Sequence, residues 1–254
     1  MAETRIQLCG RLVLVIDGTR VEGRLPARQG RVAFAYLAAN RIRPVMRGEL
    51  LEAVWPDEPP ASADAALSAL VSKLRQVIGG DRLVGRSELQ LVLAPDAFVD
   101  LEAATGAIHR AEAAVTRRDW AAAWAGGRVA LHTASRGFLV GLEGGWVDEQ
   151  RCRVHDLRVR ALEAVAETGL ALGDHEIRST ERSARILIEL EAFRESGYRY
   201  LMQAHTAAGN VAEALRVYEQ LRVLLRDELG VAPGPETQAL YRELLGAPLR
   251  AFRP

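Results

Sequence analysis

The chain has 254 residues, of which 49% are hydrophobic and 26% are charged. This composition excludes a disordered, collagenous or fibrous chain, and the length suffices for two ordinary domains of about 100 to 150 residues each. The 33 basic and 33 acidic residues cancel, so no global positive field marks the chain as a nucleic-acid binder.

The charge is divided unevenly along the chain. Up to residue 97 there are 13 Lys and Arg against 11 Asp and Glu, and beyond it there are 20 against 22. The two cysteines, Cys9 and Cys152, cannot form the disulfide framework of a small secreted domain. The apolar run from Leu12 to Ile16 is too short for a signal peptide or a membrane span. We therefore expect a cytoplasmic protein with no membrane partner.

The first part of the chain alternates between strand and helix signals. Alternating apolar residues predict a short antiparallel sheet over residues 5–25. Helical spacing follows from Gln29 to Ala39, and a second helix is predicted from Arg47 to Trp55, where a proline ends it. A third helix is predicted from a cap at Ser62 to Gly79-Gly80, and a hairpin over residues 82–93.

Beyond Ala97 the strand signals largely disappear. Alanine-rich helical segments are predicted at about residues 101–117, 120–131, 147–172, 176–190, 194–207 and 211–228. Ala208-Gly209-Asn210 repeats Leu172-Gly173-Asp174 at a separation of 36 residues, and Arg118-Asp119 offers a third, poorer copy. A period of about 34 to 36 residues is typical of tetratricopeptide repeats. The expected fold is therefore mainly α with a small β component, a winged helix followed by a tetratricopeptide-like helical array.

The order of sheet, three helices and hairpin is that of an OmpR-type winged helix. In that fold the third helix enters the DNA major groove and the hairpin lies along the backbone. The exposed side of the predicted third helix carries the small or polar candidates Ser68, Ser72, Lys73, Arg75 and Gln76. Only Arg75, and less clearly Gln76, is built for a bidentate contact to a base. An ordinary solvated helix face is the equally weighted alternative.

Phosphate contacts are expected from arginines outside that helix. They flank the hairpin or lie near the starts of the first two helices, where exposed amides also favour anions. These candidates are Arg82, Arg86, Arg28, Arg31, Arg43 and Arg47.

Signals for catalysis are weak. The five histidines stand singly on helical segments, and the glycines at 141–145 lack the Gly-Lys-Ser/Thr of a phosphate-binding loop. Cys152 lies between two arginines that would favour its thiolate, although a buried, inert cysteine is commoner on such a helix. We expect no enzyme, no cofactor and no metal.

Several short motifs, in order, resemble one family. Pro59-Pro60-Ala61-Ser62-Ala63 and Val71-Ser72-Lys73-Leu74-Arg75 are similar to the recognition-helix region of the Streptomyces antibiotic regulatory protein family. Residues 26–29 and 49–55 are similar to its first and second helices, and residues 212–218, 227–230 and 233–235 resemble the end of its bacterial transcriptional activator domain. The resemblance implies a winged-helix DNA-binding domain at 1–97, an activator domain at 98–246 and a tail at 247–254.

The same resemblance implies a sequence-specific DNA-binding transcriptional regulator. Members are commonly activators that bind direct repeats as dimers and contact RNA polymerase. Here small or acidic residues occupy the early recognition helix, and Glu88-Leu89 stands where the family's hairpin tends to have Gly-Tyr. The open alternative is a protein-interaction adaptor, or a regulator that senses a small-molecule effector, whose winged helix binds DNA weakly.

Overall fold

The computed structural model describes residues 3–56 and 60–246. These residues are mainly helical with small sheets, as predicted. Pro59 and the predicted tail at 247–254 lie outside the described residues.

Two compact units share the chain. The N-terminal unit comprises Met1–Gly106 and Ala130–Arg158, and the C-terminal unit comprises Ala107–Val129 and Val159–Pro254. The N-terminal unit therefore extends beyond residue 97, the position of the domain boundary predicted from the sequence.

A four-stranded sheet opens the N-terminal unit. Its strand order is β3-β2-β1-β7, with the antiparallel strands adjacent in sequence and β7 parallel to β1. The side chains of Ile6, Leu14 and Ile16 are buried, as the period-two pattern predicts. The strands are β1 (Arg5–Gln7), β2 (Val13–Ile16), β3 (Thr19–Arg20) and β7 (Phe98–Val99).

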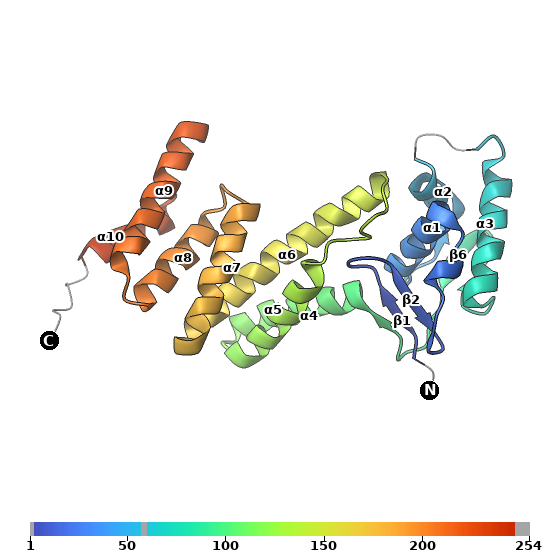
Figure 1. Ribbon diagram of the computed structural model, residues 1–254, viewed down its shortest axis with the longest axis horizontal. Coiled ribbons are helices and arrows are strands. Elements are labelled where there is room, and N and C mark those ends of the chain that lie inside the picture. Colours follow the sequence, from blue (N-terminus) through green and yellow to red (C-terminus); the bar gives the residue numbers. More distant parts are fainter. Residues whose placement is uncertain (1–2, 57–59, 247–254) are drawn as a thin grey trace. The chain divides into compact units, whose positions relative to one another are not determined.

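Helices follow the first three strands, and Figure 1 shows them in blue to cyan. A short 3-10 helix, Glu22–Arg24, leads to α1, α2 and α3. Helix α1 is buried along nearly its whole second half, from Val32 to Ala38, so it is the centre of this unit's core. The helices are α1 (Ala27–Ala39), α2 (Arg47–Val54) and α3 (Ala63–Ile78).

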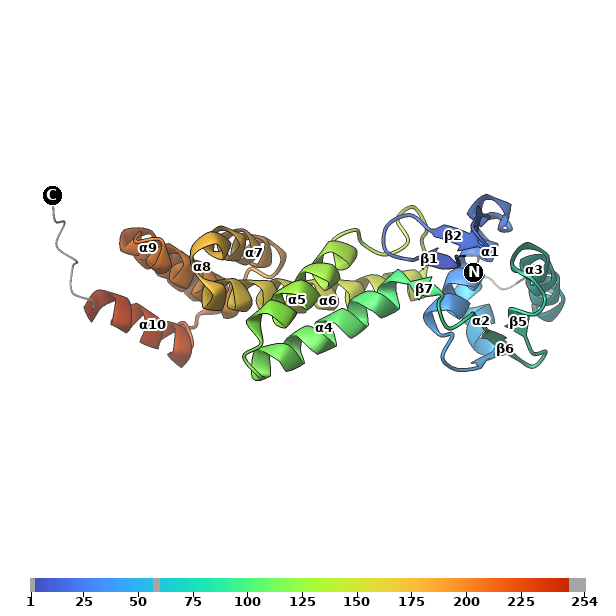
Figure 2. The same cartoon turned by 90° about the horizontal axis from the view of Figure 1, so that it is seen from below.

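A second, three-stranded sheet lies beside α3 (Figure 2). The predicted hairpin forms its strands β5 (Leu83–Val84) and β6 (Glu88–Leu91). Strand β4 (Val45–Met46), immediately before α2, pairs with β6 and was not predicted. The second sheet thus ties the start of α2 to the hairpin.

The start of α4 is bound to the first sheet. The carboxylate of Asp100, at the start of α4 (Asp100–Thr116), accepts hydrogen bonds from the amides of Leu8 and Cys9 at 2.7 and 3.1 Å. Arg136 reaches the same carboxylate at 3.0 Å. Because Asp100 is almost completely buried, these partners compensate the loss of water around its charge.

Helices are the regular elements of the described chain after β7, apart from an isolated β-bridge at Phe138. Tyr198, Leu201, Met202 and Leu221 belong to a shared core of α7, α8, α9 and α10, and Figure 2 shows α8 and α9 side by side. Helix α10, which the helical pattern did not indicate, stacks Tyr241 on Tyr218 with ring centroids 3.9 Å apart. The elements are α5 (Trp120–Ala134), α6 (Gly145–Leu172), the 3-10 helix Asp174–Glu176, α7 (Ile177–Leu190), α8 (Glu195–Ala207), α9 (Val211–Leu229) and α10 (Pro235–Gly246).

The sequence echo corresponds to three turns that share a residue with positive φ. Gly173 and Gly209 have φ of +71° and +78°, and Arg118 has φ of +58°. Each turn separates consecutive helices, so the poorer third copy places an arginine in the left-handed conformation that favours glycine.

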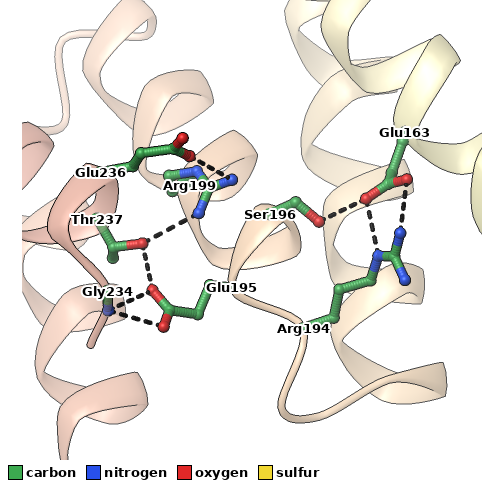
Figure 3. Close-up of polar contacts among 8 residues, drawn as sticks. All are labelled: Glu163, Arg194, Glu195, Ser196, Arg199, Gly234, Glu236 and Thr237. Carbon is green, nitrogen blue, oxygen red and sulfur yellow. Dashed lines mark hydrogen bonds and ion pairs between the residues drawn. The ribbon is translucent and has the colours of Figure 1, made fainter. Parts of the chain in front are cut away.

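Two carboxylates hold the ends of α8 and α10 (Figure 3). Glu163 of α6 binds Arg194 at 2.8 and 3.0 Å and Ser196 at 2.6 Å. Glu195 accepts the amide hydrogen of Gly234 at 2.8 Å and the hydroxyl hydrogen of Thr237 at 2.5 Å. Glu195 thereby fixes the start of α10 against α8.

Candidate nucleic-acid interface

Helix α3 has one buried and one exposed face. Leu67, Leu70, Val71, Leu74 and Ile78 are buried, as expected from their helical spacing. The opposite face is exposed and carries small or polar side chains. It consists of Ala65, Ser68, Ala69, Ser72, Lys73 and Gln76.

Arg47, the first residue of α2, connects three elements. Its Nη2 donates to the backbone oxygen of Asp64 at 3.1 Å and to the Ser68 hydroxyl at 2.9 Å. Its Nη1 lies 3.5 Å from the backbone oxygen of Arg86 in the hairpin. The exposed carboxylate of Asp64 adds an ion pair at 3.8 Å. Arg47 therefore joins the first half of α3 to α2 and the hairpin.

Arg75 makes the equivalent connection from the second half of α3. Its Nε donates to the Leu83 carbonyl at 2.9 Å and its Nη2 donates to the Gly85 carbonyl at 2.5 Å. Gly85 has φ of +90°, and a Cβ on it would meet the Glu88 carbonyl oxygen at 1.8 Å, so only glycine fits this turn. In this geometry Arg75 supports the hairpin, whereas the sequence favoured it for contact with a base.

Arg82 and Arg43 are occupied by carboxylates. Arg82 donates to both oxygens of Asp17, at 2.9 and 2.8 Å, and to the Ile78 carbonyl at 3.0 Å. Arg43 binds Glu49 at 2.5 Å. Hydrogen bonding by the Arg43 guanidinium lowers the pKa of Glu49 to about 2, with further contributions from the Met46 amide and the Tyr36 hydroxyl. Carboxylates within the protein thus largely offset the charge of both arginines, which leaves little of it to attract a phosphate.

Arg28 and Arg31 face a different part of the N-terminal unit. Arg28 donates to the Glu143 carbonyl at 2.6 Å. Arg31 lines a cleft together with Val140, Gly141 and Leu142. The structure therefore places both beside the loop that precedes α6, a contact across more than a hundred residues of chain that helical periodicity could not reveal.

The remaining candidates are accessible. Within residues 3–56 and 60–246, the side chains of Ser72, Lys73, Gln76 and Arg86 have no hydrogen bond or ion pair, while Glu88 is also exposed on the hairpin. The structure thus brings together Ser68, Arg47 and the Arg86 backbone, and leaves two accessible cations, Lys73 and Arg86, on α3 and the hairpin. Such a surface can contact phosphate, and its amide and hydroxyls can reach base edges.

Metal-ligand clusters and membrane-spanning helices are both absent from the described ranges. Over residues 3–56 and 60–246, no three His, Cys, Asp or Glu side chains are grouped so that they could hold a metal ion. None of the helices in that part of the chain combines the length and hydropathy needed to cross a membrane. Cys152 is exposed, so the sequence-based preference for a buried cysteine was wrong.

Comparison with known proteins gives a consistent family assignment. The model of the bacterial transcriptional activator domain matches residues 99–245. The regulatory protein AfsR of Streptomyces coelicolor is 36% identical over 220 residues, which cover 86% of this chain and 22% of AfsR. The transcriptional regulatory protein EmbR of Mycobacterium tuberculosis is 31% identical over 258 residues, which cover 94% of this chain and 62% of EmbR.

A solved structure shows the same likeness in three dimensions. Mycobacterium tuberculosis EmbR, in complex with a low-affinity phosphopeptide, matches with a TM-score of 0.82 and 26% sequence identity. The match covers 96% of this chain and 65% of that one. The chain thus spans only part of the length of these relatives, about a fifth of AfsR and just under two thirds of EmbR. With its activator domain and these regulatory relatives, the chain belongs to the Streptomyces antibiotic regulatory protein family.

Proposed function

We propose that this chain is a sequence-specific DNA-binding transcriptional regulator. In this proposal residues 1–97 act as an OmpR-type winged helix, with α3 in the major groove and the β5–β6 hairpin along the phosphate backbone. Residues 98–246 act as a tetratricopeptide-like activator domain. The observation that carries the proposal is the exposed polar face of α3, held to the hairpin by Arg75 and to α2 by Arg47.

The contacts divide into two classes. Lys73 and Arg86 are accessible cations for phosphate, and Arg47 can add its charge at the start of α2. Ser68, Ser72 and Gln76 are the side chains for base edges. Arg75 positions the hairpin. The other four arginines contribute to the positive electrostatic field more than to direct contacts with DNA. Three of them, Arg28, Arg43 and Arg82, are hydrogen-bonded to other parts of the protein, and Arg31 lies beside Gly141.

A surface with few base-reading groups favours binding by two copies. Each good bidentate contact is worth about 1 to 3 kcal/mol of discrimination, and Gln76 is the remaining unbound candidate for one. Two chains on direct repeats would double the contacts, and RNA polymerase bound alongside would add more. We therefore propose a cytoplasmic activator that acts as a homodimer on repeated sites and contacts RNA polymerase.

Fluorescence polarisation tests the proposal directly. The full chain is titrated with its own upstream DNA and with a scrambled duplex, at low and at moderate salt. The proposal is supported by a preference for the upstream DNA together with an affinity that falls as salt rises and is lower in Lys73→Gln on both duplexes. Glu228→Gln, an exposed change on α9, is the control. Equal binding to both duplexes would overturn it.

An adaptor function is the second candidate, since Asp64 and Glu88 expose negative charge on the same surface. Negative charge beside a phosphate lowers affinity for DNA. Co-purification of a defined protein partner, with no DNA binding by the isolated dimer, would favour the adaptor.

Light scattering tests the proposed dimer, because it measures the number of chains in the free protein and in the DNA complex.

A further inference from the structure

A cleft of about 540 Å³ opens in the N-terminal unit beside helix α1. Its walls come from the β1–β2 connection, from β3 and the residues after it, from α1, and from residues 140–142 of the loop before α6. Ligand sites are typically about 300 to 1,000 Å³ and draw on distant segments of the chain. The size and construction of the cleft therefore suit a small molecule.

The cleft carries excess positive charge. Three arginines, Arg11, Arg20 and Arg31, line it together with one carboxylate, Glu22. Arg20 is paired with Glu22. Burial opposes ionisation of Glu22, but hydrogen bonds from Arg20 and from backbone amides outweigh it and lower the pKa of this carboxyl. Glu22 is consequently charged at neutral pH, and its single negative charge offsets only the positive charge of Arg20.

Arg11 and Arg31 have no counterion among the described residues. Both are exposed, and neither guanidinium has a hydrogen bond or an ion pair with any residue in 3–56 or 60–246. Guanidinium groups present planar pairs of N–H donors that match carboxylate, sulfonate and phosphate oxygens. Both groups line the same cleft, so their charge favours an anion there.

Apolar side chains complete the walls. Leu142 is buried, Leu12 is half-buried and Val140 is 51% exposed, and all three line the cleft. An inorganic ion would leave these side chains against water, whereas an organic anion with an aromatic or aliphatic body would cover them.

The loop at the cleft is held in an unusual backbone conformation. Leu139 has φ of +42° although its side chain is completely buried, and the neighbouring Gly141 has φ of +88°. Amide hydrogen bonds from Leu139 to the Leu8 carbonyl and from Val140 to the Gly10 carbonyl, at 2.9 and 2.8 Å, fix the loop against the segment after β1. Strain of this kind persists only where surrounding contacts impose it, and it is concentrated at ligand sites.

We propose that this cleft binds a small organic anion with an apolar body, held by Arg11 and Arg31 and packed against Leu12, Val140 and Leu142. Binding of such a ligand would be a function additional to the proposed DNA binding. It also gives Arg31 a role other than the phosphate contact expected from the sequence.

Calorimetric titration with 8-anilino-1-naphthalenesulfonate, an aromatic sulfonate, tests the proposal on the full chain. Saturable binding of one molecule per chain is expected, with an affinity about a hundredfold lower in Arg11→Gln/Arg31→Gln because two charge-assisted contacts are lost. The control Arg182→Gln removes the same kind of exposed charge from α7 and should bind as the wild type. N-phenyl-1-naphthylamine, which lacks the sulfonate, should bind more weakly than the sulfonate.

A second pair of variants separates charge from shape. Val140→Glu introduces a carboxylate at the mouth of the cleft and should abolish binding of the sulfonate, whereas Val140→Gln should retain it. Circular dichroism confirms that each variant is folded. Three results would each overturn the proposal. They are the absence of saturable binding, an affinity for the neutral amine equal to that for the sulfonate, and wild-type affinity in the double arginine variant and in Val140→Glu. No DNA is present, so the result is independent of the proposed function.

Discussion

The Nη2 atom of Arg75 lies 2.5 Å from the carbonyl oxygen of Gly85. The one arginine of α3 is therefore committed to the hairpin backbone, and the polar face beside it consists of shorter or uncharged side chains apart from Lys73. If the chain binds DNA as proposed, this arrangement separates support of the hairpin from contact with the bases.

Arg75→Ala should weaken binding to upstream and scrambled DNA alike. The variant frees the Leu83 and Gly85 carbonyls and loosens the hairpin, which contacts phosphates in our proposal. We expect about a tenfold loss on each duplex, the equivalent of one charge-assisted hydrogen bond. Polarisation measures the affinities, and hydrogen exchange measures protection of residues 83–91. A loss confined to the upstream sequence would show instead that Arg75 reads a base, and Gln76→Ala is the matched change on the same helix.

Glu88→Gln should strengthen DNA binding. Glu88 is exposed on β6, the hairpin strand that we place along the phosphates. Removing its charge abolishes a repulsion between like charges, so the affinity should rise a few-fold at low salt, by about 0.5 to 1 kcal/mol, and less at high salt. Glu228→Gln on α9 is the control. An unchanged affinity would place the hairpin away from the DNA.

The order of strands and helices could be predicted because each signal is local. Apolar period, prolines and glycines mark the ends of α1, α2 and α3 to within one or two residues. The two-residue strand β4 exists only because Val45 pairs with Leu89, and β7 only because Phe98 pairs with Arg5. Such pairings join residues far apart in sequence, and neither strand is long enough to show a period.

The placement of the arginines could not be predicted for the same reason. Arg43 binds Glu49 six residues away, but Arg28 meets the Glu143 carbonyl, and Arg82 meets Asp17. A sequence pattern shows that an arginine starts a helix. It does not show which distant carbonyl or carboxylate accepts a hydrogen bond from that arginine in the folded chain.

The two cysteines should differ in reactivity. Burial raises the pKa of Cys9 to about 12, with the Asp100 carboxylate adding to the shift and Arg136 opposing it. Cys152 is exposed on α6. A disulfide reagent such as dithionitrobenzoate, used near pH 8, should therefore label one thiol per folded chain rapidly, because thiolate is the reactive form. Cys152→Ser should remove this phase, and Cys9→Ser should retain it. Rapid labelling of both thiols would show that β1 and the start of α4 separate in solution.

The turns at 118 and 209 should respond oppositely to glycine and alanine. Gly209 has φ of +78°, and a Cβ there meets nothing within 4 Å, so Gly209→Ala should cost about 1 kcal/mol through backbone strain alone. Arg118 already bears that strain at φ of +58°. Arg118→Gly should therefore stabilise the fold by about 0.5 kcal/mol, since relief of strain exceeds the added entropy of the unfolded chain. Urea unfolding measures both changes. Destabilisation by Arg118→Gly would show that the arginine side chain makes a contribution that outweighs its backbone strain.

Removal of the Glu195 carboxylate should release α10 from α8. Glu195 binds the Gly234 amide and the hydroxyl of Thr237, a residue that is completely buried (Figure 3). Glu195→Ala leaves both donors without an acceptor, which costs about 2 kcal/mol because a buried polar group without a partner retains its desolvation penalty. Glu195→Gln keeps an acceptor oxygen and should lose less.

Glu213→Ala, at an exposed ion pair on α9, should change stability by less than about 0.5 kcal/mol. Urea unfolding followed by circular dichroism reports the change, because α8, α9 and α10 lose their helical signal when the unit unfolds. If Glu195→Ala unfolds at the same urea concentration as Glu213→Ala, then the Tyr218–Tyr241 stack and the apolar contacts hold α10 without help from the carboxylate.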